Sequence, residues 1–328
     1  MLRRTSLTFT GAILAILTIL PMTRADEPRF VKTTTVYKTV DDLKIEVDVY
    51  RNDDHTVRPV LVWIHGGALI MGSRTSVPQQ LLDLCKKESY ALVSIDYRLA
   101  PEVKLPDIAQ DVEDALGWVR DKGAKAHFLD PDRIVVSGGS AGGYLTMLTG
   151  CRVKPRPRAL VAYWGYGDVD GDWYTKPSEF YRKQVPLIER DDALKGVGGK
   201  VLTGVTNSDD NKPRSRYYHY LRQNGLWTRE ITGFDPDKDK EKLDKYCPVR
   251  SLPADYPPIL MIHGTKDDDV PYEQSAAMDR ELARRKLPHE LITVEGAGHG
   301  LSGGDKKLID DANEKALAFI RKQLNNEK

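Results

Sequence analysis

The sequence predicts an α/β fold in which a mostly parallel central sheet is flanked by helices. Short, nearly continuous apolar runs recur along the chain, as expected for strands that are buried on both faces of a sheet. Amphipathic stretches separate several of these runs, and glycine-rich turns follow them. The chain has 328 residues, 40% hydrophobic and 30% charged, which suits one large globular α/β domain.

The first 25 residues have the pattern of a secretory signal peptide. Arg3 and Arg4 give a positive start, an apolar core follows at 11–20, and small residues around Ala25 suit a cleavage site. The core is shorter than the roughly 18 apolar residues that a membrane span needs. We therefore expect a secreted or periplasmic protein without a stable membrane anchor, with residues 26–328 as the mature chain.

Charge and cysteine content argue against several classes of protein. The formal net charge is +1, which gives no electrostatic case for a nucleic-acid or membrane-surface partner. The three cysteines, Cys85, Cys151 and Cys247, are an odd number, so at least one thiol stays unpaired within the chain. A disulfide scaffold is therefore not expected. The sequence leaves the pairing of the other two and the oligomeric state open.

The strand and helix signals alternate in a regular order. After the signal segment, 33–40 and 43–50 read as an antiparallel pair. The runs that we expect to form parallel strands are 60–64, 91–96, 133–138, 159–164, 258–264 and 289–296. Helical spacing is found at 107–123, 273–286 and 306–324. This alternation favours an α/β sheet with right-handed crossovers.

A serine lies between glycines at the predicted junction of the third parallel strand and the next helix. A phosphate-binding loop does not fit, because Tyr144 and Leu145 stand where a P-loop needs lysine and then serine or threonine. A dinucleotide fingerprint fails because Ser140 occupies a glycine position. The turn fits the nucleophile elbow G-x-S-x-G, in which flanking glycines remove Cβ atoms that would clash. Ser140 is the candidate nucleophile.

Other reactive groups follow the carboxyl ends of predicted strands, where catalytic groups of such sheets gather. The motif at 65–68 follows the first parallel strand, and its glycines let backbone N–H groups point at a developing oxyanion. An acidic run at 267–269 follows the fifth strand, and His299 follows the sixth. The order serine, acid, histidine is that of the α/β-hydrolase pattern.

These residue types suit acyl transfer to and from a serine. Ser140 would attack an ester carbonyl, and His299 would take its proton and return it to the leaving alcohol. Asp267 would hold the imidazole in the required tautomer. The candidate oxyanion hole consists of the backbone N–H groups of Gly66, Gly67 and Ala141. This chemistry requires no cofactor and no metal ion.

The motifs "HGGA", "DYRLAPE", "GGSAGG", "HGTKDDDVP" and "EGAGHG" resemble those of α/β-hydrolase esterases of the hormone-sensitive-lipase-like group. The likeness runs from about residue 60 to the C-terminus, apart from one insert, and extends to secreted acetylxylan and feruloyl esterase-like hydrolases. It implies the α/β-hydrolase fold and a secreted serine carboxylesterase. Its substrate would be a small-molecule or carbohydrate ester, with acetyl or feruloyl groups on polysaccharides as candidates. The family's H-G-x-x-D spacing selects Asp267 from the acidic run.

More than 90 residues separate the strands at 159–164 and 258–264, so we expect a partly helical, cap-like insert at about 165–255. Both its ends lie at the catalytic edge of the sheet. We therefore expect the insert to lie beside the site and to set substrate choice. The candidates for stacking on a feruloyl ring or a sugar face include Tyr217, Tyr218 and Trp227. Arg214 and Arg216 are candidates for binding an acidic sugar. Packing within the insert is the alternative for each.

Several alternatives stay open. The same triad cleaves amides, so a serine peptidase of this fold is one alternative function, and a non-catalytic binding protein on a hydrolase scaffold is another. We interpret His65 and His263 as structural, and the group at 96–98 as a brace for the sheet end. A calcium-loop spacing at 168–179 lacks its glycine, which favours a solvated acidic turn over a metal site.

Overall fold

The apolar runs of the sequence form one eight-stranded sheet in the computed structural model, which describes residues 28–205 and 208–325. The strand order is β1-β2-β4-β3-β5-β6-β7-β8. β1 pairs antiparallel with β2 and β2 with β4, and all other pairs are parallel. The strands are β1 (Phe30–Val40), β2 (Leu43–Asn52), β3 (Arg58–Ile64), β4 (Ala91–Ile95), β5 (Leu129–Gly139), β6 (Ala159–Tyr163), β7 (Ile259–Gly264) and β8 (His289–Val294). The predicted mostly parallel sheet, with its antiparallel opening pair, is confirmed.

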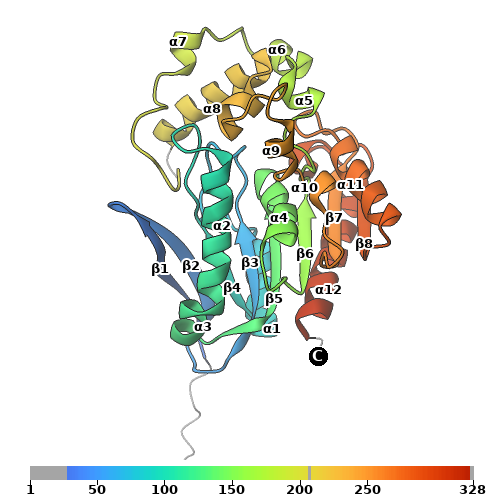
Figure 1. Cartoon of the computed structure of the whole chain (residues 1–328). Coiled ribbons are helices and arrows are strands. Elements are labelled where there is room, and N and C mark those ends of the chain that lie inside the picture. Colours follow the sequence, from blue (N-terminus) through green and yellow to red (C-terminus); the bar gives the residue numbers. More distant parts are fainter. Residues whose placement is uncertain (1–27, 206–207, 326–328) are drawn as a thin grey trace, which may run out of the picture.

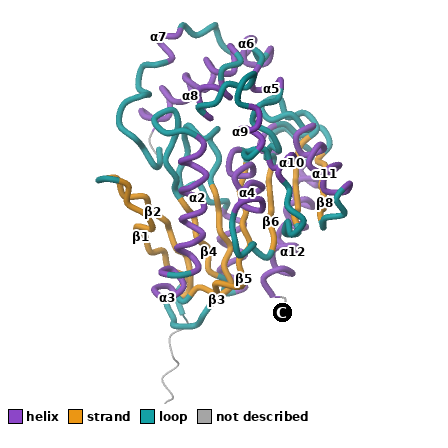
Figure 2. Tube along the Cα trace, in the orientation of Figure 1, coloured by secondary structure: helices purple, strands orange, loops and turns teal. Residues whose placement is uncertain are grey.

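Helices cover both faces of this sheet, and others lie beyond its upper edge (Figures 1 and 2). The flanking helices are α1 (Gln79–Glu88), α2 (Leu105–Arg120), α3 (Lys122–His127), α4 (Ala141–Arg152), α11 (Glu273–Arg284) and α12 (Lys306–Asn325). The short turn η2 (His299–Leu301) precedes α12. The insert contains α5 (Asp172–Thr175), α6 (Glu179–Gln184), α7 (Arg190–Ala193), α8 (Ser208–Asn224), η1 (Thr228–Thr232), α9 (Lys240–Asp244) and α10 (Pro248–Ser251).

The alternation of side chains along each strand builds two hydrophobic layers. On β3, Val62 and Ile64 face the layer that contains residues of α2 and α4. Leu61 and Trp63 face the opposite layer, which contains residues of α1 and α12. Because each fully buried side chain of this size contributes about 1.5–3 kcal/mol, the two layers hold the strands, and therefore the strand ends, in fixed positions.

The chain between β6 and β7 lies over the edge at which the parallel strands end. Figure 1 shows α5, α6 and α8 above the carboxyl ends of β3, β5 and β6, with α7 at the upper left. The insert also contacts the loop after β3, where the Val205 N–H donates to the Gly72 carbonyl at 2.9 Å. The loop that follows β3 is therefore held between the sheet and the insert.

The expected signal segment, residues 1–25, lies outside the described residues. Among the helices of the described ranges, none combines the length and the apolar character that crossing a bilayer requires. Cys85, Cys151 and Cys247 are all free thiols. Burial raises the pKa of the Cys85 and Cys247 thiols well above their usual range, which keeps them protonated and unreactive.

Candidate active site

Ser140 occupies the sharp turn between β5 and α4. Its backbone has φ 57° and ψ −121°, a conformation that is unfavourable for a residue with a Cβ atom. Two glycines make room for the turn: a Cβ on Gly138 would lie 2.4 Å from the Gly142 carbonyl oxygen, and one on Gly142 would lie 2.0 Å from the Ile64 carbonyl oxygen. The Ser140 N–H donates to the Tyr163 carbonyl at 2.9 Å, which holds the strained residue in place.

The structure brings Ser140, His299 and Asp267 together from three separate strand ends. The Ser140 Oγ lies 3.1 Å from the His299 Nε2, and the His299 Nδ1 lies 2.7 Å from the Asp267 Oδ2. A carboxylate only accepts hydrogen bonds, so the proton of the neutral imidazole sits on Nδ1 and Nε2 is left as an acceptor. The arrangement therefore lets His299 take the proton of the Ser140 hydroxyl.

The charges around His299 favour its protonated form. Burial raises the pKa of Asp267, but hydrogen bonds from His263 and His299 outweigh it and lower the pKa to about 2. Backbone N–H groups of Asp269 and Val270 also donate to the Asp267 Oδ1, at 3.0 and 2.8 Å. Burial lowers the pKa of His299, but the Asp267 hydrogen bond and the Asp269 and Asp267 charges raise it above its ordinary value. An imidazolium that forms here is thus stabilised.

His263 is the second imidazole at the acid. Its Nε2 lies 3.2 Å from the Asp267 Oδ2 and 2.9 Å from the Val270 carbonyl, and its Nδ1 lies 2.7 Å from the Ser275 Oγ. The side chain is fully buried. His263 thus supports the acid and has a structural place, in line with the interpretation from sequence.

The loop after β3 lies directly against the nucleophile turn. A Cβ on Gly66 would lie 2.8 Å from the Gly139 carbonyl oxygen and 3.2 Å from the Ser140 Cβ. Ala141 is the first residue of α4, so its N–H has no acceptor within the helix. Across the described chain, the N–H groups of Gly66, Gly67 and Ala141 donate to no protein acceptor. These N–H groups belong to a loop and a helix start that adjoin Ser140.

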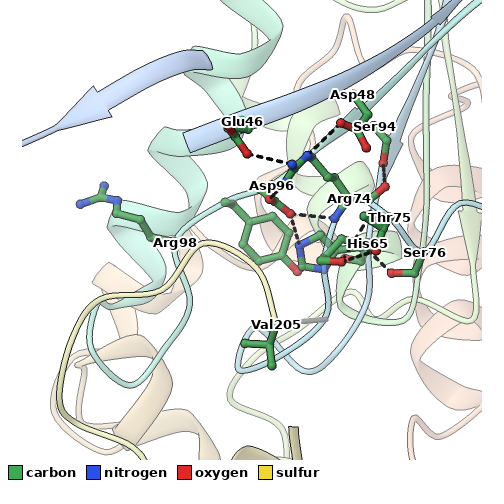
Figure 3. Close-up of polar contacts among 12 residues, drawn as sticks. Glu46, Asp48, His65, Arg74, Thr75, Ser76, Ser94, Asp96, Arg98 and Val205 are labelled. Carbon is green, nitrogen blue, oxygen red and sulfur yellow. Dashed lines mark hydrogen bonds and ion pairs between the residues drawn. The ribbon is translucent and has the colours of Figure 1, made fainter. Parts of the chain in front are cut away.

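Arg74 anchors the far end of this loop (Figure 3). Its guanidinium contacts Glu46 at 2.8 Å, Asp48 at 3.0 Å and Asp96 at 2.5 Å, and its backbone N–H donates to Asp96 at 2.7 Å. Burial raises the pKa of Asp96 to about 6, and Arg74 opposes that shift. Because Arg74 ties β2 and the end of β4 to the loop, the loop cannot swing away from Ser140 without breaking a buried charge network.

The group at 96–98 braces the sheet end as the sequence indicates. The Tyr97 hydroxyl donates to the His65 carbonyl at 3.0 Å, and its ring stacks on the His65 ring with centroids 4.2 Å apart. The Arg98 Nε donates to the Asp111 carboxylate at 2.8 Å. Burial lowers the pKa of His65 to about 4, so this imidazole is neutral and structural.

Asp269 is a second carboxylate at the site. From the sequence it was only an alternative to Asp267 as the acid that orients His299. Its Oδ2 is 3.6 Å from the His299 Nε2, whereas Nδ1 is already bonded to Asp267. Its Oδ1 accepts hydrogen bonds from the Tyr218 hydroxyl at 2.5 Å, the Tyr181 hydroxyl at 2.9 Å and the Arg222 Nη1 at 2.9 Å. No local pattern marks Asp269, because its partners come from the insert.

Two buried arginines of α8 hold the loops on either side of Ser140. The Arg214 Nη1 donates to the Ile70 and Ala100 carbonyls at 2.8 Å each, and its Nη2 lies 2.7 Å from the Glu102 carboxylate. Arg222 binds Asp269. Arg214 is only 1% exposed, which corrects its assignment to an acidic sugar. The exposed Arg216 on the same helix lies outside this set of contacts.

The aromatic side chains proposed as substrate contacts are buried in the insert, which corrects that expectation. Tyr217, Tyr218 and Trp227 are exposed by 1%, 6% and 0%. The Trp227 ring stacks on Tyr174 with centroids 3.8 Å apart. The Tyr217 hydroxyl donates to Glu230 at 3.4 Å, and the Tyr218 hydroxyl is bonded to Asp269. These rings belong to the same hydrophobic cluster as the sheet face that α2 and α4 cover, so the insert packs onto the sheet through them.

The calcium-like spacing at 168–179 forms a turn held by protein donors. Asp168 accepts from the Gly171 N–H at 2.9 Å and the Trp173 indole at 3.1 Å, and Asp170 pairs with Arg250 at 2.6 Å. Over the described ranges, no group of three metal-binding side chains is arranged to hold an ion. Asp168 and Asp170 therefore bind donors of the protein and stabilise the turn.

Comparison with known proteins agrees with this geometry. An α/β hydrolase superfamily protein from Enterococcus faecalis superposes with a TM-score of 0.67 at 20% identity, covering 90% of this chain and all of that one. Together with the strand order and the nucleophile turn, this match decides the architecture. The chain has the α/β-hydrolase fold. Within this chain, residues 47–171 match the BD-FAE family model and residues 215–327 match the prolyl oligopeptidase family.

Other structures with a similar fold are those of esterases. Thermogutta terrifontis esterase 2 phosphonylated by sarin gives a TM-score of 0.60 at 22% identity, covering 90% of this chain and 97% of that one. A carbohydrate esterase from gut microbiota gives a TM-score of 0.61 at 20% identity, and the match covers 92% of this chain and 99% of that one. Among curated proteins, a non-reducing polyketide synthase of Preussia isomera is 27% identical over 90% of this chain. The chain spans 13% of that protein's length.

Proposed function

We propose that this α/β-hydrolase is a serine hydrolase that cleaves carboxylic esters through an acyl-enzyme. The supporting observation is the continuous set of contacts from the Ser140 Oγ to the His299 Nε2, 3.1 Å, and from the His299 Nδ1 to the Asp267 Oδ2, 2.7 Å. A nucleophile, a base and an orienting acid in this geometry are the minimum for covalent acyl transfer.

The proposed reaction has two steps. The Ser140 Oγ attacks the carbonyl carbon while its proton moves to the His299 Nε2, and free backbone N–H groups of Gly66, Gly67 and Ala141 stabilise the oxyanion. The ester C–O bond breaks, and the departing alkoxide takes the proton from His299. Water then attacks the acyl-serine by the same route, and the carboxylic acid and Ser140 are released. Asp267 stays ionised throughout.

We propose an ester as the bond that is cleaved, because several proteins of similar fold are esterases. A second candidate function is hydrolysis of peptides, which is favoured by the prolyl oligopeptidase match over residues 215–327. The triad itself serves both reactions, since the leaving group is protonated by the same histidine. A direct comparison of matched p-nitrophenyl ester and p-nitroanilide substrates separates the two candidates.

Acyl groups on carbohydrates are the proposed substrate class, with acetyl and feruloyl esters as the first to test. The match to the BD-FAE family model and the structural similarity to a carbohydrate esterase support this choice. A cavity of about 170 Å³ lies beside the turn that contains His299, on the side of the sheet that α1 and α12 cover; its walls contain aromatic rings, but Ser140, Asp267 and His299 do not line it. These rings belong to Trp63, Tyr163 and Trp164.

The test begins with labelling by a fluorophosphonate, which reacts with an activated serine. Wild-type protein should take up one label at Ser140, as located by peptide mass spectrometry, and Ser140→Ala should take up none. The same samples are then assayed with p-nitrophenyl acetate, methyl ferulate, acetylated xylan and an acyl p-nitroanilide. Labelling without turnover of any ester, or turnover of the anilide alone, would contradict the proposal.

We propose further that the protein is exported and that residues 1–25 are removed. The positive start, the short apolar core and the small residues before position 26 support this. N-terminal sequencing of protein purified from its source cell is the test. Recovery of Met1, or activity found only in the membrane fraction, would contradict it.

A further inference from the structure

Within the described residues, one oxygen of the Asp269 carboxylate accepts no hydrogen bond from the protein. Its Oδ1 is bonded by three donors, but no described residue donates to its Oδ2. The Oδ2 lies 3.6 Å from the His299 Nε2, beyond hydrogen-bond distance, because Nε2 is directed at the Ser140 Oγ. The Asp269 side chain is 19% exposed, and its Oδ2 lies beside the same His299 nitrogen that contacts the Ser140 Oγ.

The three donors fix the direction of this carboxylate. Arg222 is 2% exposed, and its guanidinium lies 4.9 Å from the Tyr181 ring centroid and 5.6 Å from that of Tyr218. Trp173 and Tyr174 complete the aromatic surround, at 5.3 and 5.0 Å. The donors Tyr181, Tyr218 and Arg222 bind only the Oδ1 of this carboxylate, and its Oδ2 is left on the side of His299. The Arg222 charge also offsets the carboxylate charge, which favours a neutral hydrogen-bond donor over a cation as partner.

We propose that the Asp269 Oδ2 accepts a hydrogen bond from a hydroxyl of the alcohol part of the substrate, so that the site selects esters of polyols and sugars over esters of simple alcohols. This inference rests on the proposed ester hydrolysis. The departing oxygen must lie within hydrogen-bond distance of the His299 Nε2 to receive its proton. A hydroxyl on the neighbouring carbon lies about 3 Å from that oxygen, within reach of an acceptor beside the same nitrogen.

The substitution Asp269→Asn tests the proposal sharply. The three donors at Oδ1 will keep the amide oxygen in that position, so the amide NH₂ takes the place of Oδ2. An acceptor facing the substrate thus becomes a donor at nearly constant volume. The matched control is Asp268→Asn, which makes the same charge change at an exposed neighbouring residue.

The measurement is the ratio of kcat/KM for 2-hydroxyethyl acetate to that for propyl acetate, which differ by a hydroxyl in place of a methyl group. Wild type should favour the hydroxylated ester at least about 10-fold, and Asp269→Asn should lower the ratio by about 10- to 100-fold. Asp268→Asn should leave the ratio unchanged. The ratio cancels any uniform effect that the lost Asp269 charge has through His299.

The outcomes separate this inference from the proposed function. If wild type hydrolyses both esters equally, or if Asp269→Asn and Asp268→Asn have the same ratio, the inference is overturned while the proposed function stands. If no ester is hydrolysed, the proposed function fails first. A preference found only for p-nitrophenyl glycolate over p-nitrophenyl propionate would place the hydroxyl on the acyl part and overturn the assignment to the alcohol. If Asp269→Asn does not fold, as judged by thermal unfolding, the wild-type ratio decides alone.

Discussion

The sheet edge and the insert contribute to the candidate site in different ways. The sheet edge supplies every group that would react: Ser140, Asp267 and His299 each follow a parallel strand, of which β5 and β7 lie inside the sheet and β8 is the outermost strand. The insert supplies no reacting group, but Arg214 and Arg222 of α8 bind the loops on either side of the nucleophile. In this molecule the chemistry belongs to the strand ends, and the positioning of the loops is shared with the insert.

The physical reason for this division is rigidity. The strands before Ser140 and Asp267 are held by hydrogen bonds on both sides and by two hydrophobic layers, so the residues that follow them have few positions available. The strand before His299, β8, pairs with β7 alone. The insert shares its aromatic side chains with the hydrophobic layer on one face of the sheet, and buried charges join it to the loops beside Ser140. A change at the sheet edge should therefore alter the reaction directly, whereas a change in the insert should act through stability or through the electrostatics of His299.

The largest effect is expected from Ser140→Ala, which removes the nucleophile at the sheet edge. We expect kcat/KM for p-nitrophenyl acetate to fall by about 10⁴- to 10⁶-fold, with the melting temperature near that of wild type. Stopped assays of purified protein and a thermal scan measure both. Residual turnover within 10-fold of wild type would show that another group attacks the ester.

The next effect is expected from Asp267→Asn, which presents the wrong hydrogen-bonding partner to the His299 Nδ1. We expect a loss of about 10⁴-fold in kcat. Asp268→Asn, an exposed neighbour, is the control and should stay near wild type. Equal and mild losses in both variants would mean that the acidic run is only a solvated turn.

Arg222→Gln tests the coupling between the insert and the sheet edge. Leaving Asp269 without its buried cation should cost about 3–5 kcal/mol in the free energy of unfolding. It should also raise the pKa of His299 further, because the positive charge that opposes Asp269 is gone. Catalysis needs neutral His299, so kcat/KM rises with pH through this pKa, and the acid limb of the variant should move to higher pH.

Arg216→Gln is the control for this variant, since Arg216 is exposed on the same helix. It should change neither the unfolding free energy nor the pH profile. If Arg222→Gln keeps the wild-type pH profile, the charge of Arg222 does not affect the pKa of His299. Arg222 would then have only a structural role.

The smallest effect is expected from Tyr217→Phe in the insert. Loss of its hydroxyl contact with Glu230 should cost about 1 kcal/mol in the free energy of unfolding. The ratio of kcat/KM for p-nitrophenyl acetate to that for methyl ferulate should not change, because the side chain is buried. A shift in this ratio at unchanged stability would restore Tyr217 as a substrate contact.

The elements of the sheet and the residues at its edge could be predicted from sequence because both depend on local patterns. β3 is an apolar run bounded by polar residues, and the Ser140 turn has glycines at fixed offsets. Strand ends of a parallel sheet lie at one edge, so the order of Ser140, Asp267 and His299 along the chain was enough to place them together. The proximity of these three residues can thus be predicted from separate local motifs, each at the end of a predicted strand.

The roles of the insert residues depended on contacts between distant parts of the chain. Tyr218 and Trp227 have the residue types of a sugar-binding surface and of a hydrophobic core alike, and only the packing of the insert makes them core. Asp269 differs from its neighbours in the acidic run because Tyr181, Tyr218 and Arg222, far away in sequence, bind one of its oxygens. Burial and charge pairing are properties of the folded chain, and no local pattern encodes them.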